Sequence, residues 1–496
     1  MILLLVANMT LNAGALLGSM QLVGAADPNQ ELRLSLEPMQ ASSSPASNLY
    51  VVNGRTYAHV DELIDLMGSN GLLFYNSDSI GENQGPTGLI ANNDVILIKI
   101  NEEWPYRGGT NTDILKELIQ ALVDHPDGFI GEIVVADNGQ WQGSMDWSQS
   151  NAEDISQSTQ DVVDFFSNDF AVSTYTWIPI RGTRVDEYSE GDLRDGYVLY
   201  DYPDPETGIY VSYPKFETQF ETYISFKNGV WNGTGYEKRL KIINLPVLKS
   251  HSGYGVTGAL KHYMGVQSQG EGQAGLANGH SSVATGGMGT LMVETGLPTL
   301  NIIDAVWVNA NPPPSSGTGP GTPYNQATRV NVLVASSDPV ALDYWAAKHV
   351  LVQTAGLIGY TDTHSIDPDN TDKSGVSGEA FGVWLSRAEN EIADAGYPVT
   401  SDENRMNVYV KSEELLPSPT PSATAEPTST PTPTVTPHQS PTSSPSPAPS
   451  PSALISPTPS TPLVPEEPLV PIYIITGIIG VVLAISAITL LLKKRK

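Results

Sequence analysis

A short glycine-spaced run concentrates four basic side chains in a chain that is otherwise acidic. The stretch LPVLKSHSGYGVTGALKHYMGV (245–266) contains Lys249, His251, Lys261 and His262, whereas the 496 residues together carry 25 Lys and Arg, 54 Asp and Glu and a net charge of −29. Cations that are buried close together have lowered pKa values, and a lysine made neutral in this way acts as a base or nucleophile. The run therefore predicts a pocket for an anionic small molecule, a carboxylate or a phosphate.

The glycines of this run shape the predicted anion site. Gly255 and Gly258 permit the sharp turns and the close backbone approach that other residues resist. We expect a helix to begin here, with Thr257 and the free N–H groups of its first turn directed at the anion. Lys261 lies about one turn into that helix and would reach back to the same anion. The alternative is a surface loop whose lysines face water.

Further polar residues occur where predicted strands end. Lys99 and Asn101 end the apolar run VILIKIN, Asp137 ends EIVVADN, and Asp304 lies within TLNIIDAVWV. Ligands of open parallel sheets bind outside the carboxyl ends of the strands. We therefore expect these four residues and Lys249 to bind the ligand together.

Strand and helix patterns alternate along the chain around these residues. VILIKIN and EIVVADN are nearly continuous apolar runs, as in strands buried on both faces. TDILKELIQALVDH is amphipathic at helical spacing, with Thr112 as the expected N-cap. This order predicts an α/β fold with a parallel sheet built from Rossmann-like units.

The predicted organisation has two α/β units separated by an insertion. The N-terminal unit is expected at 45–174 and the C-terminal unit at 237–415. Residues 175–236 are rich in Tyr, Thr, Val and turn residues, which predicts an antiparallel β-hairpin insertion.

The two ends of the chain carry patterns typical of an exported, anchored protein. The apolar, uncharged run IYIITGIIGVVLAISAITLLL is long enough to cross a bilayer, and KKRK follows it. We expect a single-pass cell-surface protein, its N-terminal domain outside and its C-terminus cytoplasmic. The expected segments are a signal peptide (1–25), a Pro/Ser/Thr-rich stalk (416–470), a C-terminal transmembrane helix (471–492) and a basic cytoplasmic tail (493–496).

Composition excludes several classes of function. The chain has no cysteine, which excludes disulfides, thiolate nucleophiles and an iron–sulfur cluster. Its strong negative charge argues against nucleic acid as a partner. Asn232 begins an Asn-Gly-Thr sequon, the pattern of a glycoprotein.

Four motifs resemble one broad family. VILIKIN, INLPVLKSHSGYGVTGALKHYMG, LNIIDAVWVN and VASSDPVALDYWAAK occur in the order seen in the domain of unknown function family number 362, over residues 58–350 or so. Members of that family often add ferredoxin-type cysteine clusters, which this chain does not have.

The segment from His251 to Lys261 is also similar to the H-x3-G-x-S/T-G-x2-K segment of nickel-pincer lactate racemases. That resemblance implies a shared fold and pocket, with His251 as an acid/base and Lys261 as the covalent anchor of the cofactor. It also implies nickel or another divalent metal, for which His280 is the candidate ligand.

Two hypotheses of function follow. The first is a surface-anchored protein that binds an anionic small molecule and catalyses proton transfer or isomerisation next to a carbonyl, with His251 as base and the lysines stabilising negative charge. The second is a non-catalytic cell-surface recognition or envelope protein on the same fold. A weaker third is a calcium-stabilised adhesin, suggested by the acidic loop DPDNTDKSG.

Overall fold

The computed structural model describes residues 32–44, 46–54, 59–140, 151–268 and 279–412. The chain divides into two units, Met1–Ser418 and Pro419–Lys496, and the described residues all belong to the first. The predicted signal peptide, stalk, transmembrane segment and basic tail lie outside the described residues.

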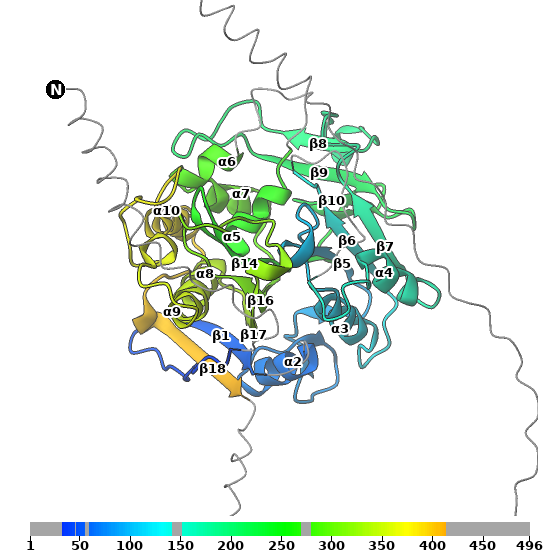
Figure 1. Cartoon of the computed structure of the whole chain (residues 1–496). Coiled ribbons are helices and arrows are strands. Elements are labelled where there is room, and N and C mark those ends of the chain that lie inside the picture. Colours follow the sequence, from blue (N-terminus) through cyan, green and yellow to red (C-terminus); the bar gives the residue numbers. More distant parts are fainter. Residues whose placement is uncertain (1–31, 45, 55–58, 141–150, 269–278, 413–496) are drawn as a thin grey trace, which may run out of the picture. The chain divides into compact units, whose positions relative to one another are not determined.

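A ten-stranded sheet forms the centre of the first unit (Figure 1). Eight of its strands follow the order β18-β1-β17-β16-β13-β5-β6-β7, while β14 pairs with β15 and β16. Its strands are β1 (Ser47–Asn53), β5 (Val95–Lys99), β6 (Glu132–Asp137), β7 (Val172–Thr176), β13 (Leu240–Asn244), β14 (Val247–His251), β15 (Gly255–Thr257), β16 (Leu300–Asn309), β17 (Thr328–Ser336) and β18 (Met406–Ser412).

The predicted fold class was wrong about the sheet, which is mixed rather than parallel. Strands β16, β13, β5, β6 and β7 run parallel to one another. Strand β17, in contrast, is antiparallel to both β16 and β1. A parallel partner would need a crossover, usually a helix, and residues 310–327 between β16 and β17 contain no α-helix. Because β1 pairs with β17 and β18, one sheet joins both predicted units.

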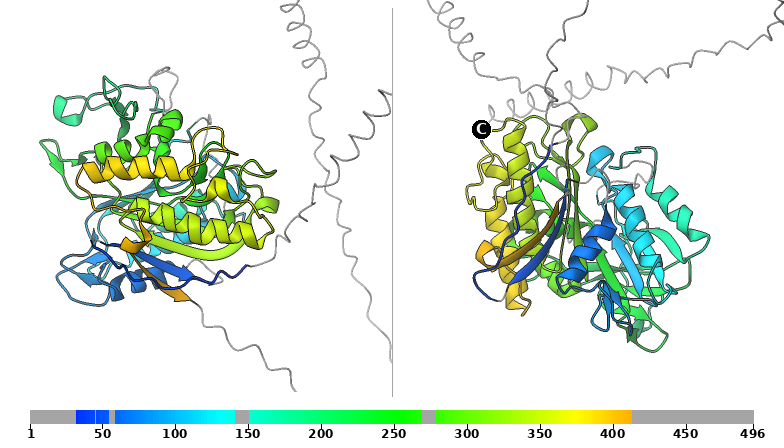
Figure 2. Two further views of the ribbon diagram at one scale, coloured as in Figure 1. Left: turned by 90° about the vertical axis from the view of Figure 1, so that its left-hand side faces the viewer. Right: turned by 90° about the horizontal axis from the view of Figure 1, so that it is seen from below.

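Helices cover both faces of this sheet (Figure 2). One hydrophobic cluster contains residues of α2, α3 and α4, and a second contains residues of α5, α7, α8 and α10. This double cover explains why β5 and β6 are buried along their whole length and largely apolar. The helices are α2 (Val60–Ser69), α3 (Thr112–Val123), α4 (Thr159–Ser167), α5 (Ala259–His262), α6 (Gly279–Ser282), α7 (Gly287–Thr295), α8 (Pro339–Ala346), α9 (Gln353–Leu357) and α10 (Phe381–Asp394).

The N-cap of α3 differs from the prediction by one residue. The side chain of Asn111 accepts hydrogen bonds from the N–H groups of Asp113 and Ile114, so Asn111 rather than Thr112 is the cap. Asparagine is among the best N-cap residues because its short side chain satisfies the free N–H groups of the first turn.

The predicted hairpin insertion is a larger element. It forms a five-stranded antiparallel sheet in the order β12-β11-β10-β9-β8. Phe226 of this region contacts the ring of Tyr263, directly after α5, with ring centroids 6.0 Å apart. The insertion therefore packs against the segment that carries Lys261. Its strands are β8 (Gly196–Leu199), β9 (Ser212–Glu217), β10 (Tyr223–Ser225), β11 (Gly229–Trp231) and β12 (Tyr236–Glu237). A separate small sheet contains β2 (Tyr75–Asn76), β3 (Gln84–Gly85) and β4 (Ile90–Ala91).

The predicted fold class also included a transmembrane helix. In the part of the chain that the structure describes, no helix is both long enough and apolar enough to cross a membrane.

Candidate functional site

A β-hairpin presents the basic residues of the 245–266 run. In the pairing of β14 with β15, Lys249 lies opposite Thr257, and His251 lies opposite Gly255. Side chains two residues apart in a strand point to the same side, so Lys249 and His251 share one face of the hairpin. Helix α5 begins two residues after β15 and brings Lys261 to the same place.

These side chains open onto a cavity of about 310 Å³ at the carboxyl ends of β5, β6 and β14. Six of the predicted site residues line it. The lining residues are Asn101, Glu103, Trp104, Gln140, Lys249, His251, Ser252, Thr257, Lys261, His262, His280 and Pro320. The volume is at the small end of the range for small-molecule sites.

The two lysines of the cavity are both buried. Burial, reinforced by the charge of Lys261 and opposed by Glu103, lowers the pKa of Lys249 to about 7. Burial, again opposed by Glu103, lowers the pKa of Lys261 to about 8. The Nζ of Lys249 donates a hydrogen bond to the carbonyl of Gly108. The Nζ of Lys261 makes no hydrogen bond or ion pair with any described residue.

His251 is held as a neutral hydrogen-bond donor. Its Nδ1 accepts a hydrogen bond from the N–H of Gly253 at 3.0 Å, so in the neutral ring the proton is on Nε2. Burial and the charge of Lys261 lower the pKa of His251 well below its usual value, which keeps the ring neutral. The geometry therefore makes Nε2 a donor, whereas the sequence predicted a base.

Other polar atoms of the cavity wall also have no hydrogen-bond partner among the described residues, and two of them belong to predicted site residues. These are Oγ1 of Thr257 and Oδ1 of Asn101, and both residues are buried. A buried polar atom without a partner costs free energy, and a bound ligand is one way to satisfy it.

Lys99 and Asp137 lie beneath the cavity and do not line it. Lys99 Nζ is 2.8 Å from Asp137 Oδ1, donates to the carbonyl of Ile100 and lies 3.0 Å from Nε2 of His262. A Cβ on Gly265 would lie 2.3 Å from this Nζ, so a larger residue there would displace the Lys99–Asp137 pair. The pair thus anchors the ring of His262, a cavity residue, rather than binding a ligand directly.

The predicted anion site at the start of α5 is already filled by the protein. The carboxylate of Asp343, on α8, accepts hydrogen bonds from the N–H groups of Ala259 and Leu260. A Cβ on Gly258 would lie 2.2 Å from Asp343 Oδ1, and one on Gly255 would lie 2.2 Å from the carbonyl of Ser365. Both glycines therefore serve packing, and neither lines the cavity.

Asp304 is also separate from the cavity. It accepts hydrogen bonds from the side chain of Asn151 and from the N–H groups of Asn111 and Val306. Burial raises its pKa to about 6. The residue joins β16 to the start of α3, which is a structural role.

His280 does not belong to a metal-binding group in the described residues. Its ring centroid lies 5.5 Å from that of His251 and 5.0 Å from that of Tyr254. Within these residues no three His, Cys, Asp or Glu side chains are grouped so as to hold a metal ion. His280 lies in the cavity wall beside His251.

Sequence reasoning missed Glu103 and Trp104. They follow Asn101 in NEEW, directly after β5, and Glu103 is the one carboxylate among the described residues that line the cavity. The same strand-end reasoning that selected Asn101 would have found them if it had been extended by three residues. His262 was noticed in the basic run but was not assigned to the site.

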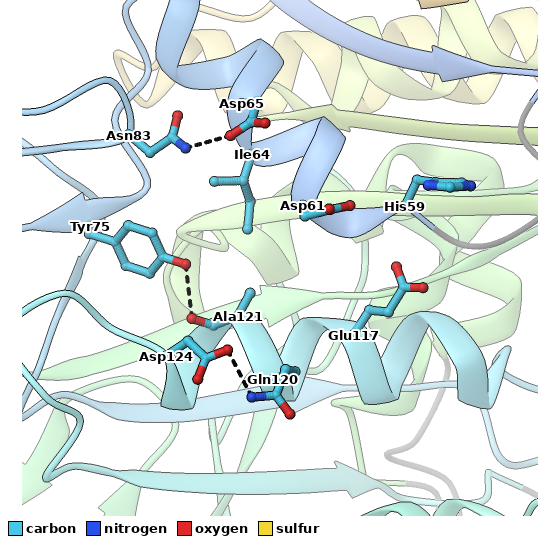
Figure 3. Close-up of a pocket in the computed structure, with 10 residues that line it drawn as sticks. All are labelled: His59, Asp61, Ile64, Asp65, Tyr75, Asn83, Glu117, Gln120, Ala121 and Asp124. Atoms are coloured by element: carbon cyan, nitrogen blue, oxygen red, sulfur yellow. Dashed lines mark hydrogen bonds between the residues drawn. The ribbon is translucent and has the colours of Figure 1, made fainter. Parts of the chain in front are cut away.

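A larger cavity of about 610 Å³ lies between α2 and α3 (Figure 3). Its polar side chains largely pair with their neighbours: Asn83 donates to Asp65, Gln120 to Asp124, and Tyr75 to the carbonyl of Ala121. The basic cavity is the better candidate, because two buried lysines open onto it and Lys261 has no hydrogen-bond or ion-pair partner among the described residues.

Comparison with known proteins adds one assignment. Residues 235–348 match the model of the family described as Domain of unknown function (DUF362). The chain carries a DUF362 domain. The matched segment supplies Lys249, His251 and Lys261 to the cavity, whereas Asn101 and Glu103 come from residues that precede it. No curated protein and no solved structure matches the chain. The resemblance to nickel-pincer lactate racemases stays a prediction.

Proposed function

We propose that the cavity binds a small anionic molecule, a carboxylate or a phosphate, and catalyses proton transfer next to a carbonyl group of that molecule. The observation that carries the proposal is that Lys249 and Lys261 open onto one cavity, where Lys261 has no hydrogen-bond or ion-pair partner among the described residues.

An anion beside Lys261 would be bound strongly because it relieves the cost of burying an ammonium group. The pKa of Lys261 is lowered from 10.5 to about 8, and an opposite charge in contact favours the protonated form again. Each unit of pKa corresponds to about 1.4 kcal/mol, so full restoration would contribute about 3 kcal/mol to binding.

The remaining polar groups suit the chemistry of a carbonyl compound. The Nε2–H of His251 can donate a hydrogen bond to a carbonyl oxygen and stabilise the negative charge that develops there. The carboxylate of Glu103, in the same cavity wall, can accept a proton from the neighbouring carbon. We therefore assign the role of base to Glu103 and the role of donor to His251.

Titration calorimetry tests the binding half of the proposal. Wild-type protein is titrated with propionate, pyruvate and inorganic phosphate, and compared with Lys261→Met and with Lys373→Met, an exposed lysine that serves as control. We expect Lys261→Met to weaken binding of the preferred anion by more than tenfold and Lys373→Met to leave it unchanged. Equal affinities in all three proteins would refute the site.

Hydrogen exchange tests the catalytic half. In D₂O, NMR follows the loss of the methyl signal of pyruvate with wild-type protein and with Glu103→Gln. Exchange above the buffer rate that is lost in Glu103→Gln supports catalysis. Binding without any exchange would favour the non-catalytic recognition role on the same cavity.

A further inference from the structure

Lys99 and Lys249 are equally buried, each about 1% exposed, but their surroundings differ. Lys99 has an ion pair with Asp137, a hydrogen bond to the carbonyl of Ile100 and a contact with His262. Three partners, one of them a carboxylate, are what an ammonium group requires. Burial lowers the pKa of Lys99, but the ion pair with Asp137 opposes that shift and favours the ammonium form, so Lys99 has the surroundings of a structural lysine.

Lys249 has the surroundings of a neutral amine. It donates one hydrogen bond, to the carbonyl of Gly108, and no described carboxylate lies within ion-pair distance of its Nζ. The charges that face it are those of Lys261 on α5, Lys99 on β5, Asp304 on β16 and Glu103 in the loop after β5. The hydrogen bond to Gly108 fixes one N–H of the amine, and the nitrogen is one of the groups that line the cavity.

We propose that Lys249 is a nucleophile that forms an imine with the carbonyl carbon of an anionic aldehyde or ketone bound in this cavity. The inference rests on the proposed function and deepens it by naming the substrate class, an anion that carries a carbonyl group. Lys261 binds the anionic group, and the backbone of β14, paired with β15, holds Lys249 in place.

The reaction needs no oxidant, reductant or further reactant. The lone pair of the Lys249 nitrogen attacks the carbonyl carbon, and the C=O π electrons move to oxygen, which takes up a proton from solvent. The nitrogen gives one proton to Glu103. Glu103 then returns that proton to the hydroxyl as the C–O bond breaks, so that water leaves, a protonated imine remains and Glu103 is again a carboxylate. The imine withdraws electrons from the adjacent carbon, which eases removal of its proton by Glu103.

Thr257 is placed to assist this step. It lies opposite Lys249 in the hairpin, and its buried hydroxyl has no hydrogen-bond partner among the described residues. A hydroxyl that both donates and accepts can hold the oxygen of the tetrahedral intermediate while that oxygen is protonated.

Borohydride trapping tests the inference on the intact protein. Wild type is incubated with pyruvate or with glycolaldehyde phosphate, reduced, and measured by intact mass and peptide mapping. We expect one adduct on Lys249, with a mass increase equal to that of the probe less one oxygen atom. The probe that is trapped identifies the anion as a carboxylate or a phosphate.

Matched variants sharpen the test. Lys249→Arg keeps a cation but has no nucleophilic amine, and should lose the adduct, whereas Lys373→Met should keep it. Lys261→Met should lower its yield at least tenfold. In the wild type, excess propionate should protect Lys249, which tests the site without any substitution.

The failures of the two proposals are distinguishable. Adducts on exposed lysines alone, or an adduct on Lys261, would overturn the imine on Lys249. If calorimetry detects anion binding while no adduct forms, the imine is overturned and the anion site stands. If neither is observed, both are overturned.

Discussion

Binding of an anion beside Lys261 should draw protons from solution, and the number taken up follows from the pKa of this residue. With a pKa of about 8, the side chain is about half protonated at pH 8 and about one tenth protonated at pH 9. A bound anion that restores the usual value of 10.5 makes it almost fully protonated at both. Uptake should therefore be about 0.5 proton at pH 8, about 0.9 at pH 9 and close to zero at pH 6.

The sign of the pH dependence follows from the same linkage. Because the bound state holds more protons than the free state above pH 8, the affinity should fall as pH rises, by up to about tenfold per unit. Below pH 7 the lysine is already charged, and the affinity should no longer depend on it.

Calorimetry with propionate in two buffers of different ionisation enthalpy measures the uptake. Propionate has no ketone or aldehyde carbonyl, so imine formation does not contribute. Lys261→Arg is the matched variant, because arginine stays charged at every pH used. This variant should still bind propionate, and its proton uptake at pH 8 should be about 0.5 proton lower than that of the wild type. Wild-type binding without proton uptake at pH 9, or equal uptake in the arginine variant, would refute the reasoning.

Three further predictions concern stability, measured by urea unfolding. Asp137→Asn leaves Lys99 buried without its carboxylate and should lower the free energy of unfolding by about 3–5 kcal/mol; a loss below about 1 kcal/mol would contradict the ion pair. Gly258→Ala places a Cβ 2.2 Å from Asp343 and should cost about 1–3 kcal/mol, whereas the control Gly356→Ala, with open space around it, should not destabilise. Burial raises the pKa of Asp343 from 3.8 to about 7, so its folded form binds a proton more tightly than its unfolded form. Its contribution to stability is therefore lost as pH rises from about 4 to 7, by up to about 4 kcal/mol, and Asp343→Asn should flatten that part of the profile; an unchanged profile would contradict it.

Local patterns predicted many of the elements. The apolar runs of β5 and β6 indicated strands buried on both faces, and helices cover both faces of the sheet. The amphipathic pattern placed α3 correctly, although its cap is Asn111 rather than Thr112. Hydrophobic periodicity reports which faces of an element are buried, and that property is local.

The direction of β17 was not predictable in this way. Its residues read as a buried strand whether it runs parallel or antiparallel to β16, because the apolar pattern is the same in both cases. The connection decides the direction, since residues 310–327 contain no crossover helix.

In the candidate site, too, the local sequence predicted which residues lie together but not which partners they have. Residue types and spacing indicated Lys249, His251, Thr257 and Lys261 as a group, because a hairpin and the helix after it bring near neighbours in sequence together. The hydrogen bonds and the charged neighbours of each group depended on residues that are distant in the sequence. Asp343 takes the N–H groups that were predicted to bind an anion, and Glu103 enters the cavity from another strand end.

The sequence by itself determined that a basic, glycine-spaced hairpin and helix follow a buried strand in an acidic chain. Only the tertiary structure decided which lysine is paired with a carboxylate and which lysines remain available to bind a ligand. Lys99 has a carboxylate 2.8 Å away, whereas Lys249 and Lys261 have none within ion-pair distance in the described residues. The protonation of a buried amine depends on desolvation and on charges brought close by folding, and neither is encoded in the few residues around it.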